Sequence, residues 1–241
     1  MLKDKVAVIY GAGGAIGGAV ARAFEREGAE LFLARHAEVD ALDERAVDEH
    51  LESVIGTAGR LDISFNAVGI PDAEILGVPL VELDAERFSL PVSAYTTSYF
   101  LTARLAARRM IPSRSGVIMT VTALHSRTGI PLVGGFGPAM AAKEGLTRSL
   151  SAELAPHGIR VVGLRPQAMP ETRTIREAFE PRAAASGISW EQWQERLASR
   201  THPRRLMTLE EVGDMAAFLA SDRASGMTGT TVNLTMGSLD D

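Results

Sequence analysis

Short apolar runs alternate with amphipathic segments along most of the chain. Five runs are brief, apolar and bounded by Gly, Asp or Pro, which is typical of strands buried on both faces. The pattern predicts strands at Val6–Tyr10, Leu31–Ala34, Asp62–Asn66, Gly116–Val121 and Ile159–Leu164. Between them, apolar residues recur at helical spacing opposite charged ones. This second pattern predicts helices at Ile16–Glu27, Asp84–Met110 and Met140–Leu154.

The alternation of strands and helices indicates the fold class. Parallel strands need crossover connections, so helices are expected on both faces of a doubly wound parallel sheet. No internal repeat or linker divides the chain, so we expect a single α/β domain over residues 1–241. The Pro- and Arg-rich stretch Pro166–Arg205 is expected to form an insertion above the sheet, with one short helix at Ser189–Arg200.

Composition excludes several classes of function. With 46% hydrophobic and 23% charged residues, the chain is not disordered. A net charge of −5 argues against a nucleic-acid surface, and the absence of cysteine removes disulfides, thiolate nucleophiles and cysteine-based metal centres. Histidines and carboxylates show no recurring metal-ligand spacing, so no metal site is predicted. The N-terminus has no leader pattern and no apolar run is long enough to span a bilayer, so we expect a soluble, cytoplasmic protein.

A glycine-rich turn, residues 10–18, joins the first predicted strand to the first predicted helix. Glycines there allow positive φ and close backbone approach, and the helix N-terminus offers N–H groups to an anionic phosphate. A strand before the motif and a helix after it are the context that a phosphate-binding turn requires. We therefore predict a dinucleotide-binding turn, with a purely structural turn as the alternative. Its residues are Gly11, Gly13, Gly14, Ile16 and Gly17.

Further motifs follow this turn along the chain. Asn66-Ala67-Val68-Gly69 follows a predicted strand, Pro166 follows another, and the C-terminal part contains Pro203–Leu206, Phe218–Asp222 and Thr228-Gly229. In this order the motifs resemble the short-chain dehydrogenase/reductase family over nearly the whole chain. The resemblance implies a Rossmann-like fold and hydride transfer between a nicotinamide cofactor and a small carbonyl or alcohol. It also implies a homodimer or homotetramer formed through the helices at residues 84–110 and 140–154.

The resemblance implies where the cofactor would bind. Its pyrophosphate would lie on the Gly11–Gly17 turn, with Asp40 near the adenine. Family members that use NAD usually carry an acid after the second strand, where this chain has Arg35, which could pair with a 2′-phosphate. NADP is therefore favoured over NAD, although an ordinary solvated arginine is the alternative. The remaining expected contacts are Asn66, Ala67, Val68 and Gly69, whose backbone would line the adenosine ribose, and Pro166 and Thr172.

The connection after the second predicted strand departs from the family pattern. Only Arg35 and His36 separate that strand from the strand-like Ala37–Val39. A parallel crossover needs about a dozen residues or more. Either the third strand of the family is lost, or Glu38–Leu42 runs as an irregular segment along the sheet edge. Both outcomes alter the part of the site that would bind adenosine, so a chain that binds no cofactor remains an alternative.

The catalytic positions depart as well. The family donates a proton from a tyrosine four residues before a lysine; Lys143 fits the lysine, but position 139 is Ala139. Counting back from position 139 places the family's serine at Ser126, whereas counting from the strand places it at Ala123. The family's helix asparagine falls on Tyr95. Loss of the proton donor would cost about 10²–10⁴-fold in rate unless another group replaces it.

The missing phenol could be replaced by Tyr95, His125 or Ser126. Tyr95 belongs to a helix position expected to point at the lysine, with Tyr99 one turn later on the same face. His125 could titrate near neutrality, and Ser126 could hydrogen-bond a substrate oxygen. The structural alternatives are that Tyr95 and Tyr99 only pack in the core and that His125 is a solvated loop residue. The predicted catalytic set is Lys143, Tyr95, Ser126 and His125 beneath a substrate lid at residues 166–205. A non-redox lyase, isomerase or cyclase, and a catalytically silent cofactor-binding protein, remain alternatives to the oxidoreductase.

Overall fold

Six parallel strands form the central sheet of the computed structural model, which describes residues 1–71 and 76–240. The strand order is β2-β1-β3-β4-β5-β6. Every neighbouring pair is parallel, so the carboxyl ends of the strands meet at one edge of the sheet. The strands are β1 Val6–Tyr10, β2 Glu30–Ala34, β3 Ile63–Asn66, β4 Gly116–Val121, β5 Ile159–Pro166 and β6 Thr230–Leu234.

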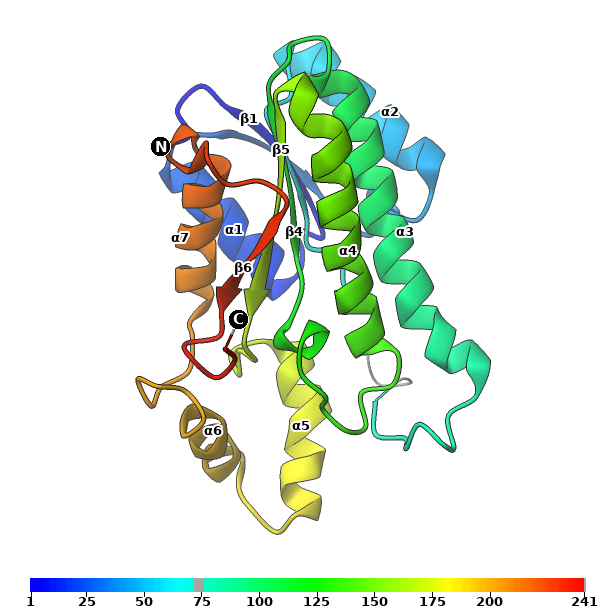
Figure 1. Ribbon diagram of the computed structural model, residues 1–241, viewed down its shortest axis with the longest axis vertical. Helices are drawn as coiled ribbons and strands as arrows, with labels where there is room; N and C mark the ends of the chain where they lie inside the picture. Colours follow the sequence, from blue (N-terminus) through cyan, green and yellow to red (C-terminus); the bar gives the residue numbers. More distant parts are fainter. Residues whose placement is uncertain (72–75, 241) are drawn as a thin grey trace.

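Helices cover both faces of this sheet (Figure 1). Helices α2 (Glu44–Ala58), α3 (Ala85–Met110) and α4 (Phe136–Leu154) lie on one face, and α1 (Ala15–Arg26) and α7 (Leu209–Ala220) lie on the other. Helices α5 (Arg173–Ala185) and α6 (Trp190–Ala198) project beyond the carboxyl ends of the strands. The expected doubly wound α/β domain is confirmed. Short 3₁₀ turns occur at Leu124–Ser126, Ala155–His157 and Asp222–Ala224.

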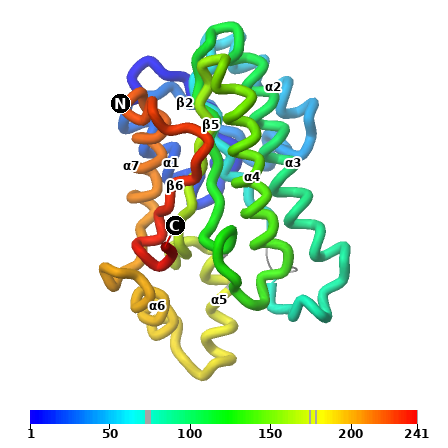
Figure 2. The backbone as a smooth tube through the Cα atoms, in the orientation of Figure 1, coloured from blue at the N-terminus to red at the C-terminus, as the bar shows by residue number. Residues whose placement is uncertain are grey.

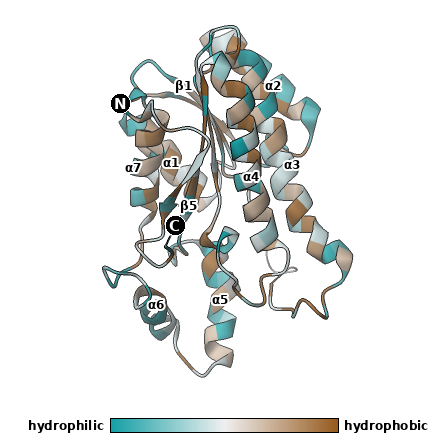
Figure 3. Ribbon diagram, in the orientation of Figure 1, coloured by the Kyte–Doolittle hydropathy of each residue, from teal (hydrophilic) through white to brown (hydrophobic). Residues whose placement is uncertain are grey.

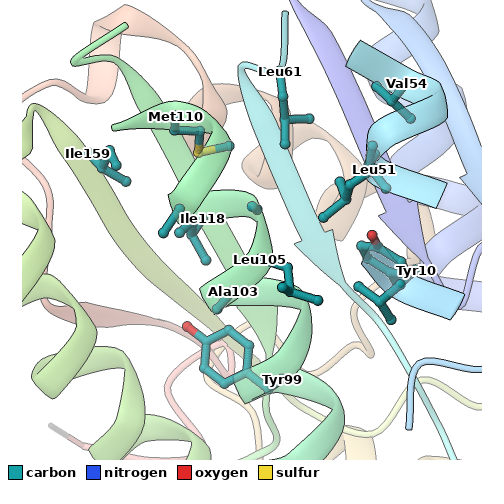
Figure 4. Packing of buried hydrophobic residues seen from close by; sticks show 14 of the residues in the cluster. Tyr10, Leu51, Val54, Leu61, Tyr99, Ala103, Leu105, Met110, Ile118 and Ile159 are labelled. Carbon is teal, nitrogen blue, oxygen red and sulfur yellow. The ribbon is translucent and has the colours of Figure 1, made fainter. Parts of the chain in front are cut away.

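Each face of the sheet has its own apolar core. On the side of α2, α3 and α4, Tyr10 and Tyr99 lie among aliphatic side chains such as Leu51 and Leu105 (Figure 4). On the side of α1 and α7, the rings of Phe24 and Phe65 meet edge to face with centroids 6.4 Å apart. Burial of both faces explains why the strands read as continuous apolar runs.

Hydropathy also distinguishes the insertion from the core. Figure 3 shows α6 mostly polar, and none of its residues is buried. Helix α6 still contacts α5, because the Trp193 ring stacks on Phe179 with ring centroids 5.7 Å apart. In the described part of the chain, no helix has the length and apolar character needed to cross a membrane.

All five predicted strands are present, and β1 and β4 have the predicted bounds. The four predicted helices are also present, although α4 begins four residues before Met140. Periodicity alone did not identify α2, α5, α7 or β6. For α2 the signal was available: Asp43 caps its N-terminus by accepting hydrogen bonds from the Arg45 and Ala46 amides, and Gly59 ends it at φ 74°.

The connection after β2 resolves the first departure from the family. Residues 35–43 form turns, in which the amides of Glu38 and Val39 donate to the Arg35 carbonyl at 2.9 Å each. The chain then enters α2 and returns to β3, which pairs with β1, so β2 is an edge strand (Figure 2). No strand forms between β2 and α2, which agrees with loss of the third strand, and Glu38–Leu42 is irregular, which agrees with the other alternative. The strand-like Ala37–Val39 forms no strand, because nothing long enough to cross the sheet precedes it.

Candidate active site at the carboxyl ends of the strands

The glycine turn packs tightly against the segment after β3. Gly11 has φ 78°, and a Cβ there would lie 2.4 Å from the carbonyl oxygen of Ala67. A Cβ on Gly17 would lie 2.3 Å from the carbonyl oxygen of Gly11. Both positions therefore exclude a side chain. Ile16 contributes instead to the core beside α1 and α7.

Helix α1 begins directly after this turn without a side-chain cap. Its N-cap is Gly14, whereas α2, α3, α5, α6 and α7 each have a side chain that accepts a hydrogen bond from the first turn. The uncapped N–H groups of α1, beside the exposed Gly13, suit an anionic group. This geometry fits the pyrophosphate of a dinucleotide.

Arg35 lies beside the same turn. Its Cγ is 3.7 Å from where a Cβ on Gly13 would be, and its guanidinium pairs with Glu38 at 3.1 Å. Hydrogen bonds from the backbone amide and the guanidinium of Arg35 lower the pKa of the Glu38 carboxyl, so this partner is ionised at neutral pH. Arg35, which the sequence analysis predicted to pair with a 2′-phosphate, thus lies beside the glycine turn and is paired with a carboxylate. Asp40 accepts a hydrogen bond from the Leu42 amide at 2.9 Å in the turn that leads to α2.

Asn66, the last residue of β3, connects three elements. Its side chain is buried; the amide donates to Thr102 Oγ1 of α3 at 3.1 Å, and Oδ1 accepts from Lys143 Nζ of α4 at 3.4 Å. The following residues pack inward, Ala67 toward the α1 side and Val68 toward the α2 side. A Cβ on Gly69 would meet no atom of residues 1–71 or 76–240 within 4 Å.

Lys143 is the most unusual buried group of the site. It is 1% exposed, and its Nζ donates to the carbonyl of Val121 at 2.9 Å. The ammonium also lies over the rings of Tyr95 and Tyr99, 5.7 and 5.6 Å from their centroids. Burial lowers the pKa of Lys143 to about 7, so near neutral pH it carries its charge only part of the time.

Tyr95 of α3 packs beside Ala139, the position at which the family resemblance led us to expect a tyrosine. Ala139 is fully buried and belongs to one apolar cluster with Tyr95 and Met140. The Tyr95 ring meets Phe136 edge to face at 5.7 Å, and its hydroxyl accepts from the Ile70 amide at 3.5 Å. A phenol from α3 therefore lies next to both Ala139 and Lys143.

Tyr99 is a different case. Its side chain is fully buried, and its hydroxyl shares a hydrogen bond with Thr147 Oγ1 at 3.1 Å. Burial raises the pKa of the Tyr99 phenol above its ordinary value, so it keeps its proton. Tyr99 is a packing residue that lies beneath the lysine.

His125 and Ser126 lie in the 3₁₀ turn after β4. The His125 ring meets Phe136 edge to face at 5.1 Å, on the ring that Tyr95 also contacts. Burial lowers the pKa of His125 to about 4, so the prediction that it titrates near neutrality is wrong. The Ser126 hydroxyl lies 2.5 Å from Glu144 Oε1.

Glu144 and Arg165 form a buried ion pair that the sequence analysis missed. They are 4% and 3% exposed, with Arg165 Nε 2.8 Å from Oε1 and its terminal nitrogen 3.0 Å from Oε2. Burial would raise the pKa of Glu144, but hydrogen bonds from Arg165 and Ser126 outweigh it and leave the pKa below its usual value. The sequence did carry a signal for this pair: Glu144 directly follows Lys143, and Arg165 is a charged residue at the end of an otherwise apolar strand.

The insertion begins where β5 ends at Pro166, which pairs with Leu234 of β6. Gln167 follows and is 5% exposed, and its Oε1 has no hydrogen-bond partner among the described residues. Thr172 donates to the Met169 carbonyl at 2.9 Å and caps α5. A buried acceptor without a donor at this edge suits the amide of a nicotinamide cofactor. The predicted site residues therefore lie near the carboxyl ends of β1, β2, β3, β4 and β5, except Asp40, which lies in the turn before α2.

Comparison with known proteins agrees with this geometry. A family model described as enoyl-(acyl carrier protein) reductase matches residues 34–238. Secoisolariciresinol dehydrogenase of Forsythia intermedia is 30% identical, over 95% of this chain and 86% of its own. Sorbitol-6-phosphate 2-dehydrogenase of Klebsiella pneumoniae is 28% identical, over 98% and 96%.

Solved structures give the same result. An NAD⁺-bound xylitol dehydrogenase superposes with a TM-score of 0.86 at 25% identity, covering 98% of each chain. Sorbitol-6-phosphate 2-dehydrogenase of Erwinia amylovora superposes with a TM-score of 0.87 at 23% identity, covering 98% of this chain and 100% of its own. The family match, the relatives and the arrangement of the glycine turn, Asn66 and Lys143 agree: the chain belongs to the short-chain dehydrogenase/reductase family.

Proposed function

We propose that the chain is an NADP-preferring oxidoreductase that interconverts a small alcohol and its carbonyl compound, with Tyr95 as the proton donor. The observation that carries this proposal is the phenol of Tyr95 packed against Ala139 and beside Lys143. The phenol comes from α3 rather than from α4, but it has the same neighbour, a buried lysine. Family membership supports the oxidoreductase class, and the named relatives are dehydrogenases.

The reaction divides between the cofactor and this chain's residues. A nicotinamide cofactor, when bound, supplies or accepts the hydride. Tyr95 gives its proton to the oxygen that becomes an alkoxide during carbonyl reduction. Lys143, with its Nζ 5.7 Å from the Tyr95 ring centroid, stabilises the phenolate that remains. Asn66 and the Val121 carbonyl hold the lysine in this position.

We propose that Tyr95→Phe lowers the rate of hydride transfer by about 10²–10⁴-fold, because the proton donor is removed while the ring remains. Oxidation of NADPH is followed by absorbance against a panel of small ketones and aldehydes. Tyr99→Phe is the matched control on the same helix; its hydroxyl is engaged with Thr147, so its removal is expected to leave the rate unchanged. Full activity in Tyr95→Phe would remove Tyr95 from the mechanism.

The proposed cofactor contacts follow from the turn and its surroundings. The pyrophosphate would lie on the N-terminus of α1, and the 2′-phosphate would replace Glu38 as the partner of Arg35. Asp40 would lie near the adenine, the Asn66–Gly69 backbone along the ribose, and Pro166 and Thr172 at the nicotinamide end. Residues 166–205 would cover the substrate, and α3 and α4 would form the contacts of a homodimer or homotetramer.

Calorimetric titration with NADPH and NADH tests this assignment. The wild type is expected to bind NADPH more tightly, and Arg35→Ala is expected to lose that preference while NADH binding stays the same. Glu38→Gln is the matched control: it removes the competing carboxylate 3.1 Å from Arg35, so NADPH affinity is expected to rise. If neither cofactor binds, the redox assignment fails and a lyase, isomerase or cyclase becomes the better candidate.

A further inference from the structure

A buried carboxylate determines which way the Ser126 hydroxyl points. Glu144 Oε1 lies 2.5 Å from Ser126 Oγ, 3.1 Å from Thr122 Oγ1 and 2.8 Å from Arg165 Nε. The guanidinium of Arg165 also reaches Oε2, at 3.0 Å, so it grips the carboxylate with two nitrogens. Four donors therefore surround one acidic group at the carboxyl ends of β4 and β5.

An ionised carboxylate can only accept hydrogen bonds. Glu144 stays ionised because Arg165 pairs with it and the hydroxyl groups stabilise its charge. The proton on Ser126 Oγ must therefore point at Glu144. What Ser126 presents to any other partner is its lone pairs, which can accept a hydrogen bond but cannot donate one.

Ser126 lies where its outward-facing lone pairs could contact a substrate. The 3₁₀ turn Leu124–Ser126 directly follows β4, and Ser126 remains partly exposed while Glu144 and Arg165 are buried. His125 and Tyr95 contact the same ring of Phe136, which brings this turn to the side of the site where Tyr95 lies. A substrate held at Tyr95 has the Ser126 turn as a neighbour.

We propose that Ser126 accepts a hydrogen bond from a second, non-reacting hydroxyl of the substrate, and that the site therefore takes polyols and hydroxyketones in preference to simple alcohols and ketones. Glu144 is the positioning residue that turns the Ser126 lone pairs outward. Tyr95 serves the reacting oxygen, so the two residues do not compete for one proton. This inference rests on the proposed oxidoreductase function and adds its substrate class.

Three ketones of one carbon skeleton test it: butan-2-one, 3-hydroxybutan-2-one and 3-methoxybutan-2-one. The hydroxyl can donate to Ser126, whereas the methoxy group has an oxygen but no proton. With NADPH, the wild type is expected to reduce the hydroxyketone with a kcat/KM about fivefold to tenfold above both others, the effect of one hydrogen bond. Ser126→Ala is expected to abolish this preference, so that the variant reduces the hydroxyketone with a kcat/KM no higher than that of the methoxyketone.

Two further variants complete the test. Ser149→Ala removes a hydroxyl of α4 that bonds only to the Gly145 carbonyl among its described contacts, and it is expected to preserve the preference. Glu144→Gln/Arg165→Met removes both buried charges together, because Glu144→Gln alone would keep the buried Arg165 charge while removing the charge of the carboxylate it binds, and so threaten folding. With no anion to orient it, Ser126 can donate as well as accept, so the ratio of hydroxyketone to methoxyketone kcat/KM is expected to fall toward one.

The outcomes separate the two proposals. Reduction of all three ketones at equal kcat/KM, or a hydroxyketone preference that survives in Ser126→Ala, would overturn the role of Ser126 and leave the oxidoreductase in place. No oxidation of NADPH with any of these ketones or with the wider carbonyl panel would overturn the proposed function and this inference with it. A preference lost only in Ser126→Ala and the double charge variant supports both.

Discussion

Exchange of the phenol between two helices tests the central feature of the site. Tyr95→Asn/Ala139→Tyr returns the tyrosine to α4, four residues before Lys143, and removes the ring that α3 supplies. Both positions belong to one buried cluster, with Tyr95 6% and Ala139 0% exposed. The two rings would therefore occupy overlapping space, and only one of them can be accommodated without strain.

The magnitude follows from this shared space. Ala139→Tyr alone overfills the cluster and is expected to cost about 1–3 kcal/mol of unfolding free energy. Tyr95→Asn alone removes a buried ring and is expected to cost about 3–5 kcal/mol. If the positions were independent, the double variant would lose about 4–8 kcal/mol. Because one ring refills the volume left by the other, we expect a favourable coupling of about 2–3 kcal/mol.

Urea denaturation of the wild type, both single variants and the double variant measures this coupling directly. Hydride-transfer rates on the same four proteins give a second readout: Tyr95→Asn is expected to lose about 10²–10⁴-fold, and the double variant to recover most of that loss. Additive unfolding free energies would refute the shared volume. Full coupling in stability without recovery of the rate would refute the equivalence of the two phenols.

Two further predictions concern Lys143 and the glycine turn. The folded-state pKa of Lys143, about 7, lies below its ordinary 10.5, so the unfolded chain binds more protons between these values and stability rises with pH in that window. Lys143→Met removes the cost of burying this charge. The unfolding free energy of the variant minus that of the wild type is therefore expected to be larger at pH 6 than at pH 10, by about 5 kcal/mol at most. If urea denaturation gives the same difference at both pH values, the pKa of Lys143 is not depressed. Gly11→Ala is expected to destabilise the fold by more than about 1 kcal/mol, because Gly11 has a positive φ and a Cβ there would clash with Ala67. Gly56→Ala is expected to stabilise the fold by about 0.5–1 kcal/mol, because a Cβ there in α2 meets no described atom within 4 Å. Thermal unfolding of both variants measures the two effects, and equal shifts in Tm would show that the turn tolerates a side chain.

The sequence by itself determined the parts of this protein that depend on local pattern. Strands β1 and β4 have the bounds read from their apolar runs, and the glycine turn lies between a strand and a helix as expected. The motifs also indicated the family, and the spacing between Ala139 and Lys143 predicted that the usual phenol is missing. These features follow from residue type and short-range spacing, which can be read directly from the sequence.

Only the tertiary structure decided what the site residues can do. Burial lowers the pKa of His125 to about 4, well below the near-neutral pKa expected from its residue type, and burial of Lys143 brings its pKa near neutrality. Glu144 and Arg165 lie 21 positions apart on a helix and a strand, and only packing pairs them and turns the Ser126 hydroxyl inward. Desolvation and the direction of a proton depend on which groups surround an atom in space, and that arrangement exists only after the sheet and its helices have come together.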